Sequence, residues 1–173
     1  HTTVGAELTI GFTITGLAAR PVTKAGARPG DVLILTKALG SGTIMAAEMA
    51  LARIPGAILG EAVAACWAAM AVPQDKAAGI LAPVAHAMTD VTGFGLAGHL
   101  LEMLEASGVA ARLSLAGLPL MDGAEALAAQ GVASSIAPAN RAAVMGRMSV
   151  PEGPRGALLF DPQTAGPLLA AVP

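Results

Sequence analysis

Aromatic residues are scarce in this sequence of 173 residues: they make up 2% of it, with one Trp, three Phe and no Tyr. A folded core must therefore be built from Ala, Leu, Val, Ile and Met. Charged residues are also few, at 13%, whereas hydrophobic residues reach 54%. Disordered chains combine low hydrophobicity with high net charge, so this composition excludes disorder. The length suits one domain with a single core.

The sequence has no cluster of basic residues, and its net charge is −2. Sequence-independent binding to nucleic acid needs several Lys or Arg side chains that neutralise phosphates. We therefore expect no nucleic-acid partner.

There is a single cysteine, Cys66, which cannot form an internal disulfide. It lies in an Ala-rich run that reads as a helix, where a buried and unreactive thiol is expected. The three histidines show no ligand spacing among themselves, so we predict no zinc site. A chain without disulfides fits a cytoplasmic setting.

No apolar run is long enough to predict a membrane span, although the mean hydropathy of +0.66 is high. The most apolar window, residues 57–72, contains Glu61 and is bounded by Pro55 and Pro73. A spanning helix needs roughly 20 apolar residues, so we interpret this window as a buried helix and expect no membrane partner. We also find no signal peptide. The chain opens at His1 without Met, and we expect it to be a piece of a larger protein.

Strands and helices are intermixed in the predicted order, which indicates an α+β fold with one mixed β-sheet flanked by helices. We predict strands at residues 7–19, 31–36, 84–91, 109–115 and 156–160. We predict helices at residues 41–53, 58–71, 75–83, 96–107, 121–130, 138–148 and 164–172.

Some of these elements carry finer expectations. The strand at 31–36 reads as buried on both faces, and Ser41 or Thr43 is expected to cap the helix that follows. The strand at 7–19 is apolar but separated by a turn-rich link. Residues 1–20 are therefore a candidate strand of a missing N-terminal domain.

Asp90 stands where the chain departs from generic apolar packing, between a predicted strand and Gly93-Phe94-Gly95. A carboxylate at a strand end needs a cation, a cap or solvent. Turns with two glycines let backbone amides face an anion, and a carboxylate can hold the accompanying Mg²⁺. We interpret Asp90 as a metal ligand. The alternatives are that Asp90 caps the next helix, for which Thr92 is better placed, and that the glycines only form a tight turn.

Four other side chains are candidates for phosphate or catalytic work, each with a structural alternative. Asp161 opens a predicted helix but most Asp-Pro turns are caps. Arg141 and Lys37 could meet a phosphate, whereas surface positions are commoner for both. His99 is better explained as a packed or half-exposed histidine.

Four segments together resemble the selenide, water dikinase (selenophosphate synthetase) family. They are residues 1–3, 26–37, 89–99 and 159–164, with Thr89-Asp-Val-Thr-Gly-Phe-Gly95 the most specific string. The resemblance covers the C-terminal half of such an enzyme. It departs from the family at Ala165-Gly166-Pro167, where Ser-Gly-Gly is common.

The resemblance implies a two-domain, usually dimeric enzyme of the aminoimidazole ribonucleotide synthetase superfamily. It implies that selenide, ATP and water give selenophosphate, AMP and phosphate with Mg²⁺. Asp90 falls on a metal ligand and His1 on an ATP contact, whereas the reactive Cys or selenocysteine and its Lys belong to the missing half. We therefore expect no catalytic residue in this chain, and Cys66 is not a nucleophile. Two rivals remain: another ATP-dependent member of the superfamily, and a non-catalytic partner module.

Overall fold

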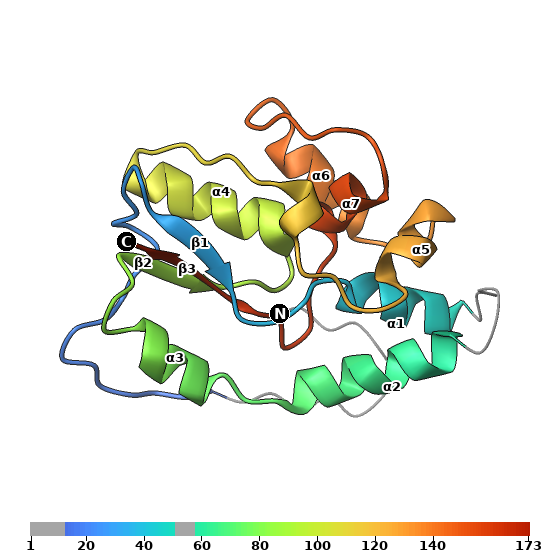
Figure 1. Ribbon diagram of the computed structural model, residues 1–173, viewed down its shortest axis with the longest axis horizontal. Helices are drawn as coiled ribbons and strands as arrows, with labels where there is room; N and C mark the ends of the chain where they lie inside the picture. The colour runs from blue at the N-terminus through green and yellow to red at the C-terminus, as the bar shows by residue number, and fades with distance from the viewer. Residues whose placement is uncertain (1–12, 51–57) are drawn as a thin grey trace.

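The computed structural model describes residues 13–50 and 58–173. Within them, three short strands form one sheet in the order β1-β3-β2. The strands are β1 (Val32–Leu35), β2 (Ala87–Asp90) and β3 (Leu168–Val172). Helices pack around this sheet, so the predicted α+β class is confirmed (Figure 1). Both pairs of described strands are antiparallel, where the sequence favoured a mixed sheet.

The helices surround the sheet unevenly. The longest beside it, α4, lies along one face, and α3 lies toward the other (Figure 1). The α-helices are α1 (Ser41–Met49), α2 (Ile58–Ala71), α3 (Asp75–Leu81), α4 (Gly95–Ser107), α5 (Ala124–Ala129), α6 (Ala137–Val144) and α7 (Pro154–Ala157). Two 3₁₀-helices, η1 (Leu115–Gly117) and η2 (Leu158–Phe160), complete the described elements.

Two apolar clusters hold these elements together. One lies between the sheet and α4, and contains Leu96, Met103, Phe160 and Leu169. The other joins α1, α2 and α5 around Ile44, Cys66 and Leu127. The aliphatic core expected from the lack of aromatic residues is thus present, with Phe160 as its one buried ring in the first cluster.

The last part of the chain differs from the prediction. Residues 156–160, predicted as a strand, belong to α7 and η2, whereas residues 164–172, predicted as a helix, contain β3. As the central strand, β3 is buried on both faces, so it has no alternation of polar and apolar residues. A short continuous apolar run of this kind cannot be told from a buried helix by periodicity.

Two other predicted strands are not strands where the structure describes them. Residues 109–114 are irregular and lead into η1. Residues 13–19 are irregular and exposed, with the side chains of Ile14 and Leu17 almost fully in solvent. The rest of that predicted strand, residues 7–12, lies outside the described residues.

Burial was overestimated in two elements. β1 is an edge strand whose Val32 and Ile34 side chains are exposed, so it is not buried on both faces. α2 buries only one side, at Ala62, Val63 and Cys66, while Trp67 is exposed. In the part of the chain that the structure describes, no helix combines the length and apolar character needed to cross a bilayer.

Candidate functional site

The turn after β2 and the loop before β3 lie side by side. Because the two strands are antiparallel and Asp90 is opposite Leu168, the end of β2 meets the start of β3. The Val91 N–H donates to the Pro167 carbonyl at 2.8 Å, and the Gln163 N–H donates to the Thr92 carbonyl at 2.9 Å. Backbone hydrogen bonds therefore fix the turn that carries Asp90 against the 161–167 loop.

Asn140, on α6, joins the same two segments from a third direction. Its side-chain amide donates to the Gly93 carbonyl at 2.8 Å and to the Phe160 carbonyl at 3.0 Å. The residue is buried, at 9% exposure, so breaking either bond would leave a polar group without water. Asn140 therefore orients the turn, a role that the sequence did not reveal.

Gly95 lets the turn pack closely on η2. Its φ is +70°, and a Cβ at this position would stand 2.8 Å from the Leu159 carbonyl oxygen. Both the backbone conformation and the contact thus require glycine. The first turn of α4 is buried as a result. Thr92 does not cap this helix: Phe94 is at the N-cap and no side chain caps it.

Asp90 is the part of this turn that remains open. Its side chain is exposed, and none of the described residues forms a hydrogen bond or ion pair with its carboxylate. An exposed carboxylate at a rigid strand end fits one oxygen ligand of a hard cation such as Mg²⁺. Within residues 13–50 and 58–173, no three His, Cys, Asp or Glu side chains gather as a metal cluster. The carboxylate of Asp90 thus has no neighbouring His, Cys, Asp or Glu cluster among the described residues.

His99 lies beneath the turn. It is buried, its ring is 5.4 Å from the Phe94 ring, and its Nε2 is 3.4 Å from the Thr92 hydroxyl. The predicted packed histidine is thus confirmed. Burial lowers the pKa of His99, whereas the negative charges of Asp90 and Glu102 act in the opposite direction.

This shift predicts a loss of stability on mild acidification. Because the pKa of His99 is lower in the folded state than the ordinary 6.5, the unfolded chain binds more protons as the pH falls below about 7. The free energy of unfolding should therefore decrease between pH 7 and pH 5.5. Urea unfolding of the wild type and of His99→Gln measures this effect. If the variant showed the same pH dependence as the wild type, His99 would not be its source.

The Asp161-Pro-Gln-Thr164 segment performs structural work. The Asp161 carboxylate accepts hydrogen bonds from the Thr43 hydroxyl at 2.8 Å, the Gly42 N–H at 3.1 Å and the Gln163 side-chain amide at 2.9 Å. The Gln163 side-chain oxygen accepts from the N–H groups of Gly40 and Ser41. Together they satisfy the N-terminal amides of α1, which have no partner within the helix.

The capping of α1 differs from the prediction, because its N–H groups are capped by side chains of the 161–167 loop. Ser41 and Thr43 are not its caps; both are buried within the helix and bond to the distant loop. Asp161 is 1% exposed, so its structural alternative is favoured over phosphate binding. Burial raises the pKa of Asp161, although the hydrogen bonds from Thr43, Gln163 and Gly42 lower it.

The two basic candidates, Arg141 and Lys37, both form contacts with other protein groups. Arg141 pairs with Glu152 at 2.8 Å and lies 5.6 Å from the Phe160 ring centre. Lys37 donates to the carbonyls of Val72 and Ala165, and burial lowers its pKa. Both side chains thus have partners within the protein.

Two further predictions concern Cys66 and His1. Cys66 is fully buried as predicted, and its burial raises the pKa of the thiol, with the charge of Asp161 adding to the effect. His1, the predicted ATP contact, lies outside the described residues.

Several curated proteins are similar to this chain over nearly its whole length. Proteins named selenide, water dikinase from Geobacter metallireducens, Nitratidesulfovibrio vulgaris and Myxococcus xanthus are 44%, 40% and 37% identical to it. The matches cover 98%, 99% and 100% of this chain, but 49%, 50% and 50% of those proteins. The chain thus spans about half the length of the curated relatives it matches.

Solved structures with a similar fold are thiamine-monophosphate kinases. The enzyme from Stenotrophomonas maltophilia matches 87% of this chain and 42% of its own with a TM-score of 0.55 at 19% identity. The enzyme from Aquifex aeolicus matches 91% and 46%, also with a TM-score of 0.55 and 19% identity. At this identity, the likeness concerns the fold.

Residues 28–152 match the family described as AIR synthase related protein, C-terminal domain. The chain belongs to this family.

Proposed function

We propose that this chain is the C-terminal domain of a two-domain selenophosphate synthetase. The reaction converts selenide, ATP and water to selenophosphate, AMP and phosphate. The relatives that carry the name selenide, water dikinase match over nearly all of this chain and about half of their own length. The missing half is then the N-terminal domain. The resemblance implies that this domain carries the reactive Cys or selenocysteine and its Lys.

The observation that carries the proposal is the open carboxylate of Asp90 on a turn held from three sides. Phosphoryl transfer depends mainly on positioning and on neutralising phosphate charge. Bound Mg²⁺ would supply that neutralisation of phosphate charge. Asp90 would contribute one oxygen, and the turn that carries it is held by the hydrogen bonds of Val91, Thr92 and Asn140.

This chain alone would hold the metal poorly. A hard cation takes about six oxygens, and Asp90 offers one carboxylate. The remaining ligands must come from ATP, water and the N-terminal domain, so the site is completed only where the two domains meet. His1 would lie at that junction as an ATP contact.

We also propose three further properties for the full-length protein: dependence on Mg²⁺, dimerisation and a cytoplasmic location. Dimerisation would involve the N-terminal domain. The rivals are another ATP-dependent member of the superfamily and a partner module without activity. A full-length sequence lacking the N-terminal Cys or selenocysteine, Lys and aspartates would favour the latter.

A product assay tests the proposal. The full-length protein with selenide, ATP and Mg²⁺ should form selenophosphate, AMP and phosphate, followed by ³¹P NMR. The 173-residue chain should form none under the same conditions. A full-length protein that phosphorylates another substrate but not selenide would assign it to a different activity of the superfamily, and turnover by the isolated chain would contradict the division of the site.

A further inference from the structure

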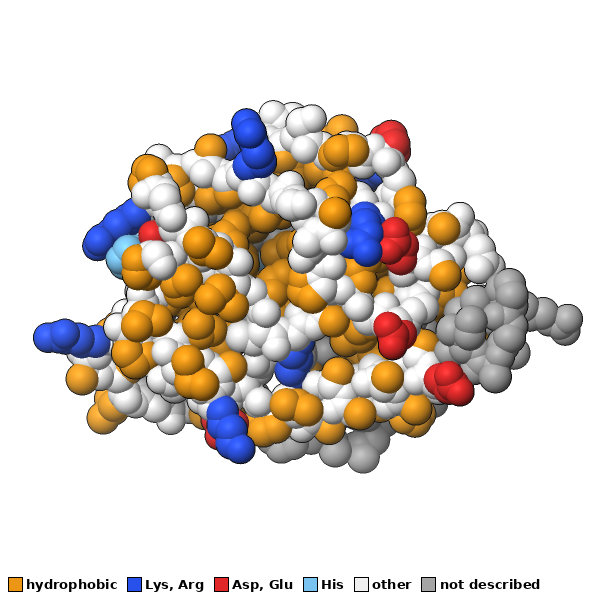
Figure 2. Space-filling model, in the orientation of Figure 1, with side chains coloured by type: hydrophobic (Ala, Val, Ile, Leu, Met, Phe, Trp, Pro, Cys, Tyr) orange, Lys and Arg blue, Asp and Glu red, His pale blue; other side chains and the backbone are white. Residues whose placement is uncertain are grey.

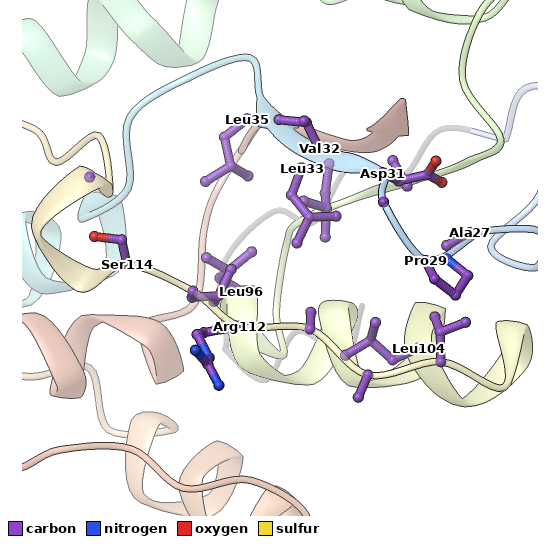
Figure 3. Close-up of a pocket in the computed structure, with 18 of the residues that line it drawn as sticks. Ala27, Pro29, Asp31, Val32, Leu33, Leu35, Leu96, Leu104, Arg112 and Ser114 are labelled. Carbon is purple, nitrogen blue, oxygen red and sulfur yellow. The ribbon is translucent and has the colours of Figure 1, made fainter. Parts of the chain in front are cut away.

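A groove of about 670 Å³ separates β1 from the irregular segment at residues 110–114. Figure 3 shows Leu33 and Leu35 of β1 on one side and Leu96 and Leu104 of α4 on the other. Figure 2 shows the same place as a hollow with hydrophobic side chains inside it. At about 30 Å³ per water molecule, the groove would hold roughly 20 waters. Releasing water from apolar walls is favourable, so the groove favours closure.

The wall formed by β1 has backbone groups that β3 does not pair. The Thr36 N–H donates to the Leu168 carbonyl, which identifies this pair as a hydrogen-bonded one. In an antiparallel ladder such pairs alternate with pairs that lack hydrogen bonds. Leu33 and Leu35 therefore direct their N–H and C=O groups away from β3, toward the groove. An unpaired edge of this kind is a template for a further strand.

The facing segment also has an unpaired backbone and the side-chain pattern of a strand. In the described part of the chain, no hydrogen bond involves the backbone of residues 110–113. Ser114 is extended, with φ −87° and ψ 110°. Leu113 and Leu115 are half-buried against the apolar cluster beside α4, whereas Arg112 and Ser114 are exposed. This alternation is that of a strand with one buried face.

Pairing between the two walls already exists at one end of the groove. Leu39, which follows β1, forms a parallel bridge with Leu120. The Leu39 N–H donates to the Pro119 carbonyl at 2.9 Å, and the Met121 N–H donates to the Leu39 carbonyl at 2.8 Å. The two chain segments therefore run in the same direction and meet just beyond the groove.

We propose that residues 110–114 are a strap that closes onto the outer edge of β1 as an additional, parallel strand. Pairing Leu33 with Leu113 and Ile34 with Ser114 places both leucines toward α4 and the other two side chains away from it. These partners are 80 positions apart in the sequence, whereas those of the existing bridge are 81 apart. The turn at η1 therefore holds one extra residue, as a bulge does.

Both ends of the strap are anchored, so closure moves only a few residues. At one end the Val109 N–H donates to the Leu104 carbonyl at 3.1 Å. At the other end the Arg155 guanidinium donates to the carbonyls of Leu115 at 2.8 Å and Ala116 at 3.3 Å. Since these ends are already fixed, closure adds little loop entropy. In return it pairs backbone groups on both walls and releases water from the groove.

Disulfide cross-linking tests the closed state in the 173-residue chain. The pair Ile34→Cys and Ser114→Cys is placed in a Cys66→Ala background, with oxidised glutathione as the oxidant. Adjacent strands lie about 4.8 Å apart, which suits the Cα separation of about 4.4 to 6.8 Å in a disulfide. The matched control pairs Ile34→Cys with Ala110→Cys, which lies about 13 Å further back along the strap. The first pair should cross-link at least about tenfold faster, and equal rates would overturn the proposal.

Hydrogen exchange at the amides of Leu33 and Leu35 gives an independent test. Closure should protect both amides, and Leu113→Asp should increase their exchange rates at least about tenfold, because it places a charge in the apolar groove. Ser114→Asp is the matched control: its side chain faces away from the groove, so the rates should stay near those of the wild type. The amides of β3 should keep their protection in every variant, which verifies the fold.

Two results of the exchange experiment would contradict the strap. One is equal exchange at Leu33 and Leu35 in the wild type and in Leu113→Asp. The other is protection that rises with protein concentration, which would make a second copy the partner of β1. If Leu113→Asp does not fold, the comparison of the two cross-linked pairs decides alone, because neither of them places a charge in the groove.

Discussion

Asp90→Asn should lower kcat/KM for selenophosphate formation by the full-length enzyme by at least about 100-fold, and the loss should lessen as Mg²⁺ is raised. The substitution keeps the size of the side chain and removes its charge, and a neutral amide is a weak ligand for a hard cation. Asp90 forms no hydrogen bond or ion pair with a described residue that the change would break. Its thermal unfolding should therefore match that of the wild type.

A matched control for this prediction is Asp122→Asn. Asp122 is also exposed but stands before α5, away from the turn, so its removal should leave the dependence on Mg²⁺ unchanged.

The ionisation of His99 gives a readout besides activity. Because the charge of Asp90 raises the pKa of His99, Asp90→Asn should lower that pKa in an NMR titration of the isolated chain. Unchanged kinetics in Asp90→Asn would remove this residue from the site, whatever His99 does.

The sequence correctly predicts those elements whose ends or buried faces are marked by residues within the element itself. α4 has apolar residues at helical spacing and ends at Gly108 in the left-handed conformation, so both its face and its end could be read. β2 ends at Asp90, where the apolar run stops. In contrast, β3 is a uniform apolar run at the centre of the sheet, and only its neighbours decide that it is a strand.

The same distinction applies to the site. Asp90 stood out because a carboxylate between an apolar run and two glycines is unusual in itself. Asn140 and Gln163 act across the fold: Asn140 bonds to Gly93, 47 positions away, and Gln163 to Gly40, 123 positions away. No local pattern encodes such contacts. Asn140 falls at the start of the predicted helix at residues 138–148, but its hydrogen bonds to Gly93 and Phe160 depend on α6 lying against the turn and η2.

The structure predicts that Asp161→Ala lowers the free energy of unfolding of the 173-residue chain by about 3 kcal/mol. The substitution leaves the Gly42 N–H, the Thr43 hydroxyl and the Gln163 amide without their shared acceptor in a buried place. Buried donors without partners each cost about 1 to 3 kcal/mol, and the loop can relax to recover part of this. Urea unfolding at pH 7 measures the loss.

Asp161→Asn separates the hydrogen bonds from the charge. Its amide oxygen can still accept from Gly42 and Gln163, while its NH₂ group can donate to the Thr43 hydroxyl, which rotates to accept. We therefore expect Asn to lose much less stability than Ala. Asp122→Ala, at an exposed position, should stay within about 0.5 kcal/mol of the wild type. If Asp161→Ala were as stable as Asp122→Ala, the Asp161 carboxylate would not stabilise the start of α1. The capping of α1 would then rest on the Gln163 side-chain oxygen, which accepts from the N–H groups of Gly40 and Ser41.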